Sequence, residues 1–194
     1  MPLSQLDPSP ALILIDLQKM VVGLTAAHPV NEIVERSARL AHAFRERGFP
    51  VILVNVAGRA PGRTETRFNF TPAPDWAELV PELNQQPEDY TVTKQQAGAF
   101  YGTALEQILR RRGVTQVFLT GIATTGGVES TARNAHDRGY NVVLVVDAMT
   151  DRDPDAHRNS IEKIFPRIGE TTTTDAVLSQ LQEQARLANV AVHQ

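Results

Sequence analysis

The feature that most constrains the fold is an alternation of short, almost continuously apolar runs with longer stretches of helical periodicity. The apolar runs cover residues 11–15, 50–54, 90–93, 116–120 and 141–146, with a weaker run at 167–171. The helical patterns cover residues 30–47, 103–112, 125–138, 154–165 and 175–187, and glycines close several of them. Strands without polar alternation are buried on both faces, so the pattern predicts an α/β fold with a parallel sheet between two layers of helices.

Composition limits the class of protein. A length of 194 residues with 42% hydrophobic residues suits one domain spanning residues 1–194. The net charge of -3 favours neither nucleic acid nor an anionic membrane as a partner, and the run Arg110-Arg111-Arg112 fits a solvated helix end. No secretory signal and no membrane-spanning apolar run is recognisable, and the absence of cysteine excludes disulfides and a thiol nucleophile. We therefore expect a soluble cytoplasmic protein.

Polar residues follow the ends of several predicted strands. Asp16 follows the first strand, Lys94 the third, the turn at 120–127 the fourth, and Asp147 the fifth. Ligands of open parallel sheets bind outside the carboxyl ends of the strands, where the strand order reverses. We therefore expect these residues at one ligand-binding edge. The long polar segment 57–87 is typical of a binding loop.

Two of these positions could supply acid–base and backbone chemistry. Burial would raise the pKa of Asp16 and a nearby Lys94 ammonium would lower it; the alternative is that Asp16 only caps a turn. In the turn, Gly126 and Gly127 would let a ligand approach backbone N–H groups at a helix start. The alternative is that Thr125 is the N-cap of the helix and the two glycines only relieve crowding against the sheet.

These motifs together resemble the isochorismatase-like (cysteine hydrolase) superfamily. The resemblance rests on Asp16-Leu17-Gln18, on Lys94 with residues 99–103, on residues 121–124 and 128–133, and on residues 138–148. It implies a three-layer α/β/α fold with a six-stranded, mainly parallel, Rossmann-like sheet, a hydrolase activity, and a homo-oligomer, either a dimer or a tetramer. It also implies a cis peptide bond between Ile122 and Ala123.

The family's Asp-Lys-Cys triad matches this sequence at two positions and departs from it at the third. Asp16 and Lys94 match, whereas the cysteine position falls on Gly127, so a thioester intermediate cannot form. Glycine at that position resembles the true isochorismatases, which hydrolyse a vinyl ether without a covalent nucleophile. The glutamine that helps them to bind isochorismate is replaced here by Val56.

The expected binding residues follow from the same resemblance. We expect Phe100, Tyr101, Ala123 and Gly126 to line the substrate site, with Trp76 and Phe70 as weaker candidates. An anionic substrate could be held by Arg63, together with Arg59 and Arg67, although arginines in a polar loop are more often solvated. The family's metal-binding Asp-x-His pattern is absent from 55–58, so we expect no metal and no cofactor. Surface roles are expected for all five histidines, which are His28, His42, His136, His157 and His193.

Three functional hypotheses follow. The first is a hydrolase that acts on a small anionic metabolite, with Asp16, Lys94 and Gly127 at the catalytic centre and vinyl-ether or related hydrolysis as the reaction. The second is a binding or scaffolding protein that keeps the fold without the chemistry. The third is that Gly127 replaces a native cysteine as an engineered trap.

Overall fold

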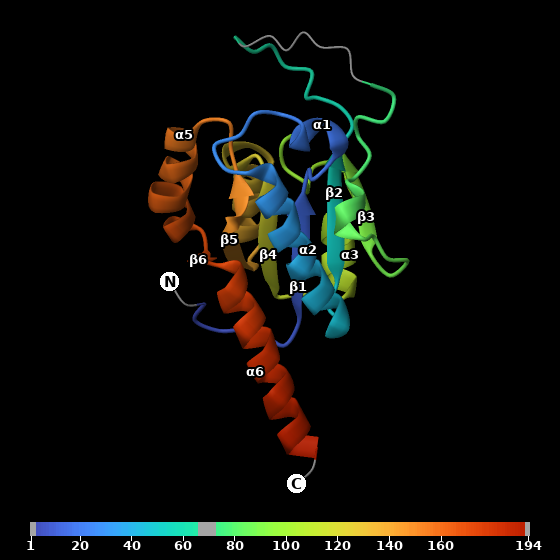
Figure 1. Cartoon of the computed structure of the whole chain (residues 1–194), viewed down its shortest axis with the longest axis vertical. Coiled ribbons are helices and arrows are strands. Elements are labelled where there is room, and N and C mark those ends of the chain that lie inside the picture. The colour runs from blue at the N-terminus through green and yellow to red at the C-terminus, as the bar shows by residue number, and fades with distance from the viewer. Residues whose placement is uncertain (1–2, 66–72, 193–194) are drawn as a thin grey trace.

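The structure is a computed structural model that describes residues 3–65 and 73–192, with side chains as far as residue 187. Its described part contains a six-stranded sheet in the order β3-β2-β1-β4-β5-β6, in which every neighbouring pair is parallel (Figure 1). The strands are β1 Pro10–Ile15, β2 Val51–Val56, β3 Tyr90–Lys94, β4 Gln116–Ile122, β5 Asn141–Thr150 and β6 Glu170–Thr172. The predicted six-stranded parallel sheet is confirmed.

Helices connect the strands. The α-helices are α1 Lys19–Val22, α2 Val30–Glu46, α3 Leu105–Arg111, α4 Glu129–Asp137, α5 Pro154–Asn159 and α6 Thr174–Val192. The shorter elements are the 3-10 turns η1 Pro81–Leu83 and η4 Phe165–Arg167 and the π-helical turns η2 Thr124–Val128 and η3 Ser160–Ile164. Among the helices so described, none is long and apolar enough to cross a membrane.

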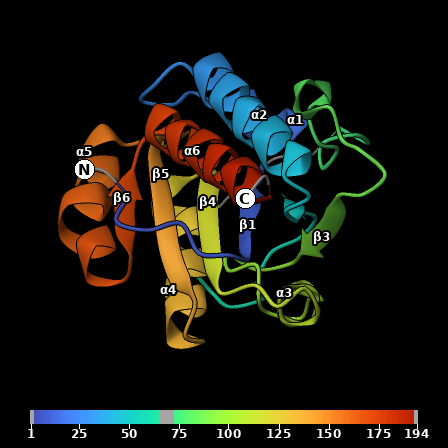
Figure 2. The ribbon, with the colours of Figure 1, turned by 90° about the horizontal axis from the view of Figure 1, so that it is seen from below.

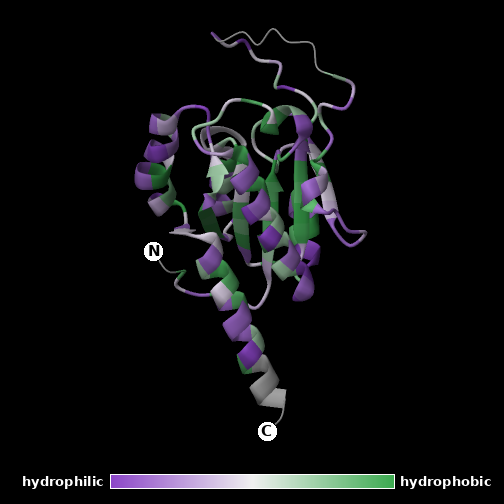
Figure 3. Ribbon diagram, in the orientation of Figure 1, coloured by the Kyte–Doolittle hydropathy of each residue, from purple (hydrophilic) through white to green (hydrophobic). Residues whose placement is uncertain are grey.

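The helices form a layer on each face of the sheet. Helices α2 and α6 cover one face, and α3 and α4 cover the other (Figure 2). Strand β1 supplies both cores, because Ile13 and Ile15 pack with the α3–α4 layer and Leu12 and Leu14 with the α2–α6 layer. The central strands are correspondingly hydrophobic along their length, while the outer helix surfaces are hydrophilic (Figure 3). The three-layer α/β/α prediction is thereby confirmed.

The order of connections changes direction beside β1. The chain passes from β1 to β2 and β3 on one side, and then crosses back to β4 on the other side of β1. Parallel sheets of this order bind ligands at such a switch point, outside the carboxyl ends of the two central strands. Here those ends are Ile15, which precedes Asp16, and Ile122. Ile122 and Ala123 lead into η2, which contains Gly126 and Gly127 and is called the glycine turn below.

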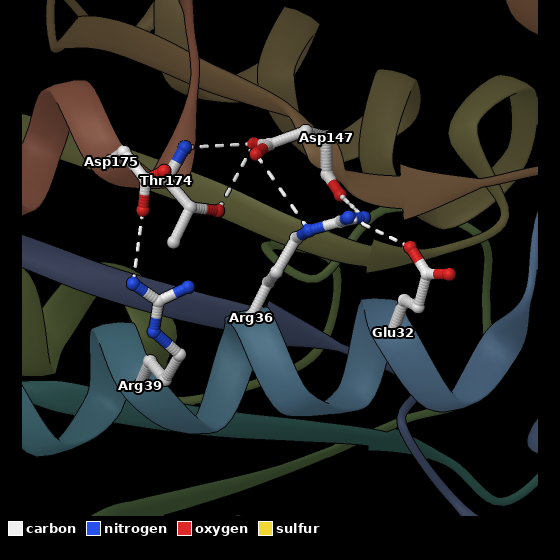
Figure 4. A network of polar contacts seen from close by, with 6 residues as sticks. All are labelled: Glu32, Arg36, Arg39, Asp147, Thr174 and Asp175. Carbon is white, nitrogen blue, oxygen red and sulfur yellow. Dashed lines mark hydrogen bonds and ion pairs between the residues drawn. The ribbon is translucent and has the colours of Figure 1, made fainter.

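Asp147 does not lie where the sequence pattern placed it. Strand β5 continues to Thr150, so Asp147 lies within the strand. Its carboxylate accepts hydrogen bonds from the backbone N–H of Thr174 at 2.8 Å and its hydroxyl at 3.0 Å, and Arg36 of α2 lies 3.9 Å away (Figure 4). The expectation of a fourth ligand-edge residue was wrong here, because this side chain caps α6 and joins it to α2.

The other differences concern the ends of elements. The predicted helix at 154–165 is a short α-helix followed by π-helical and 3-10 turns. The segment after β2 returns to the sheet edge, where Gln18 and Leu79 form an isolated antiparallel bridge. The parts of this segment that the structure describes lie over the end of the sheet at which β1 and β2 finish (Figure 1).

Candidate functional site

Asp16 stands at the end of a completely buried strand. All six residues of β1 are buried, and the backbone N–H of Asp16 still pairs with the carbonyl of Val54 at 2.9 Å. The chain then leaves the sheet through a left-handed backbone at Asp16, with φ of 53°. Aspartate adopts this conformation more readily than most residues. Asp16 is only 6% exposed, so its carboxyl group faces the protein interior.

Lys94 reaches Asp16 from the far side of β2. It is the last residue of β3 and pairs in register with Val56 of β2. The Nζ atom donates a 2.7 Å hydrogen bond to Oδ2 of Asp16 and a 3.3 Å hydrogen bond to the carbonyl of Gln96. Lys94 is 2% exposed. The two side chains therefore form a buried ion pair that joins residues 78 positions apart.

The electrostatics of this pair are set by competition between burial and charge. Burial raises the pKa of Asp16 to about 6, and the neighbouring Lys94 ammonium opposes that rise through its charge and its hydrogen bond. Desolvation penalises the ionised carboxylate and outweighs the attraction. Oδ1 of Asp16 is buried and has no hydrogen-bond partner among the described residues. Asp16 therefore has one oxygen bound to Lys94 and a second oxygen that can hold a proton.

The glycine turn completes this group of residues. The peptide bond between Ile122 and Ala123 is cis, as the resemblance implies, and η2 follows it directly. A Cβ atom placed on Gly127 would lie 2.8 Å from Cγ2 of Ile15, 3.1 Å from Oδ2 of Asp16 and 3.5 Å from Nζ of Lys94. The α-carbon of Gly127 thus faces the ion pair, and it packs so closely against Ile15 that even a methyl group there would be crowded.

The structure brings together the predicted catalytic residues but disperses the predicted binding residues. Phe100 lies in the core, where its ring is 6.2 Å from that of Tyr140. Tyr101 is 56% exposed, and Arg63 is exposed in the segment after β2. Ala123 and Gly126 are half-buried members of the turn.

Four further candidates belong to the long segment, and the structure describes two of them. Arg59 donates a hydrogen bond to Oγ1 of Thr64 at 2.5 Å. Trp76 is half-buried, and its carbonyl accepts hydrogen bonds from the side chain of Gln18 and the backbone of Met20. Phe70 and Arg67 lie outside the described residues.

Sequence reasoning missed two buried polar residues behind the turn. Asp151, 6% exposed, follows β5, and its Oδ2 accepts hydrogen bonds from the N–H of Thr125 at 2.8 Å and its hydroxyl at 2.7 Å. His157 shares a 2.8 Å hydrogen bond between its Nδ1 and Oγ1 of Thr124. Asp151 was obscured because the strand appeared to end at Asp147.

The expectation that all histidines are superficial was wrong for one of them. His157 is 7% exposed, and its pKa is lowered by burial and by the neighbouring His28. His28, His42 and His136 are exposed, and His193 lies outside the described residues. Within residues 3–65 and 73–192, no three histidine, aspartate or glutamate side chains are grouped in a way that could hold a metal ion.

Comparison with known proteins identifies the family. Residues 10–176 match the isochorismatase domain. The isochorismatase family protein YwoC of Bacillus subtilis is 41% identical over 180 residues, covering 89% of this chain and 94% of that protein. The isochorismatase of the same organism is 30% identical over 185 residues, covering 91% of this chain and 59% of that protein. The solved structure of an isochorismatase family protein from Burkholderia thailandensis has a TM-score of 0.83 and 41% identity, covering 93% of this chain and 98% of that one. The chain therefore belongs to the isochorismatase family, whose members are hydrolases.

Proposed function

We propose that the chain hydrolyses a small anionic metabolite by acid–base chemistry at Asp16, assisted by Lys94, without a covalent intermediate. One observation carries this proposal. Oδ1 of Asp16 is buried and unpartnered among the described residues, while Oδ2 is bound to Lys94 2.7 Å away. Such a carboxyl group can hold a proton near neutral pH and release it to a bound substrate.

The absence of a nucleophile supports this assignment. Gly127 occupies the position at which the resemblance places the catalytic cysteine, and the sequence contains no cysteine at all. An acyl-enzyme therefore cannot form on a thiol. A Cβ atom at Gly127 would lie 2.8 Å from Cγ2 of Ile15 and 3.1 Å from Oδ2 of Asp16, so the packing around the ion pair suits a residue without a side chain.

Vinyl-ether hydrolysis is a reaction that this arrangement could catalyse. The protonated Asp16 would transfer its proton to the outer alkene carbon, and the electron pair of the double bond would form the new C–H bond. The resulting oxygen-stabilised cation would take the oxygen atom of a water, and a proton of that water would return to the Asp16 carboxylate. The hemiketal would then break its bond to the departing oxygen, its hydroxyl proton passing to that oxygen, to give a carbonyl compound and an alcohol.

Lys94 would hold Asp16 in place and favour an anionic substrate. Its two described hydrogen bonds leave the third ammonium proton for a substrate carboxylate. The buried ammonium would attract such a group more strongly than a solvated cation, because the local dielectric constant is low. Arg63, on the exposed segment, is a second candidate for contact with a carboxylate.

A substrate panel tests the proposal. Vinyl ethers with and without carboxylates, together with amides and ureas, are incubated with the wild-type chain and with Asp16→Asn. We expect turnover of a carboxylate-bearing vinyl ether by the wild type and loss of that turnover in Asp16→Asn. The control is Asp137→Asn, which changes an exposed carboxylate at the end of α4. Full activity in Asp16→Asn would contradict the mechanism, and tight binding without turnover would favour a binding protein.

A further inference from the structure

The glycine turn has two sides with different chemistry. Its front is Gly127, which faces Asp16 and Lys94. Its back carries the side chains of Thr124 and Thr125, both of which are hydrogen-bonded to residues that follow β5. The position of Gly127 beside the ion pair therefore depends on the hydrogen bonds that Thr124 and Thr125 make on the opposite side of the turn.

The first of these contacts is a carboxylate held at both oxygens. Oδ2 of Asp151 accepts hydrogen bonds from the backbone N–H of Thr125 at 2.8 Å and from its Oγ1 at 2.7 Å. Oδ1 accepts a hydrogen bond from the backbone N–H of Arg152 at 2.7 Å. Hydrogen bonds to an ionised acceptor are stronger than neutral ones. The carboxylate thus fixes the first residues of the turn relative to the end of β5.

The second contact is a buried imidazole. Nδ1 of His157 lies 2.8 Å from Oγ1 of Thr124, which is completely buried. On its other side, the His157 ring lies 4.7 Å from the ring of His28, centroid to centroid. His28 is itself fixed by a 3.0 Å contact between its Nδ1 and Oγ1 of Thr150. The imidazole is therefore held between the turn and the segment that precedes α2.

We propose that Asp151 and His157 are positioning residues that hold the η2 turn against the Asp16–Lys94 pair. Lys94 approaches Asp16 from the β3 side, and η2 closes the other side of the same carboxylate. An outward shift of η2 would admit water beside Oδ2 of Asp16 and weaken the burial that raises its pKa. The inference rests on the proposed function only for its kinetic measurement.

The test uses near-isosteric substitutions that remove one hydroxyl at a time. Thr125→Val removes the hydroxyl bond to Asp151, and Thr124→Val removes the bond to His157, whereas Thr125→Ser and Thr124→Ser retain them. The matched control is Thr172→Val, since Thr172 is fully buried in β6 and its Oγ1 has no hydrogen-bond partner in the described chain. The pKa of Asp16 is measured in each variant by carbon-13 carboxyl NMR between pH 4 and 8.

We expect both valine variants to lower the pKa of Asp16 by about half a unit or more, and both serine variants to restore it. With a substrate from the panel, kcat falls about tenfold in the valine variants while KM changes less than about twofold. Thr172→Val leaves both quantities unchanged. An unchanged pKa in the folded valine variants, or an equal shift in Thr172→Val, overturns the proposal. If no substrate is turned over, the pKa measurement still decides this inference, and only the proposed function fails.

Discussion

The raised pKa of Asp16 predicts a specific dependence of stability on pH. A carboxyl group with a higher pKa in the folded state binds its proton more tightly when the chain is folded. Its contribution to stability is therefore fully present below pH 3.8, the ordinary pKa, and is lost as the pH rises through about 6. The difference between 3.8 and about 6 corresponds to about 3 kcal/mol, since one pKa unit is worth about 1.36 kcal/mol.

The variant Asp16→Asn isolates this contribution, because asparagine resembles a permanently protonated aspartate. Asparagine also tolerates the left-handed backbone at this position, where φ is 53°. Other titrating groups are shared by both proteins and cancel in the difference between their free energies of unfolding. We expect the wild type to lose about 2–3 kcal/mol relative to Asp16→Asn between pH 4 and pH 8.

Urea denaturation at intervals of pH, followed by circular dichroism, measures this difference. The exposed control Asp137→Asn is carried through the same series. A difference that stays flat would show that the pKa of Asp16 is no higher in the folded state than in the unfolded state. A difference that grows in favour of the wild type as pH rises would show that Lys94 outweighs burial. Either result would refute the electrostatic reasoning.

Three further predictions concern the same elements. Gly127→Ala should lower the free energy of unfolding by about 1–3 kcal/mol in urea titrations, since the new Cβ would lie 2.8 Å from Cγ2 of the buried Ile15. Lys94→Met should raise the pKa of Asp16 above about 6 in carboxyl NMR and abolish turnover, because the opposing positive charge is removed. Asp147→Ala should cost about 1–2 kcal/mol of stability in thermal denaturation, since the start of α6 loses its capping carboxylate.

Each of these predictions has its own control and contrary outcome. Gly62→Ala, where a Cβ would meet nothing within 4 Å, should change stability by less than about 0.5 kcal/mol. Equal effects at the two glycines would show that crowding at Gly127 is not the cause. Lys94→Arg retains the charge and should keep the pKa of Asp16 nearer to the wild-type value. Asp147→Asn keeps an acceptor oxygen, and a loss equal to that of Asp147→Ala would argue against capping.

The sheet was predictable because strands that are buried on both faces consist almost entirely of apolar residues. The apolar residues of β1, 11–15, must be enclosed on both sides, and the glycines at 48, 113 and 139 mark the helix ends. The sheet edge at which Asp16 and Lys94 meet followed from the same reasoning, since parallel strands finish at one edge. The sequence also correctly placed the glycine turn next to this edge.

The sequence could not determine how far β5 extends or which polar side chains turn toward the site. Asp147 and Asp151 lie only four positions apart at the end of the same apolar run, and only the packing of the fold makes the first a cap of α6 and places the second behind the turn. Phe100 belongs to the part of the family motif that follows Lys94, and we therefore expected it to contact the substrate. In the fold its ring packs in the core beside Tyr140.

The sequence by itself therefore determined the layers, the parallel sheet and the placement of Asp16, Lys94 and the glycine turn at one edge of it. These depend on local periodicity and on burial, which each segment of the chain encodes separately. The tertiary structure decided the 2.7 Å ion pair, the unpartnered oxygen of Asp16 and the anchoring of the turn by Asp151 and His157. Those features depend on distances and desolvation between segments far apart in the chain, which arise only when the segments pack together.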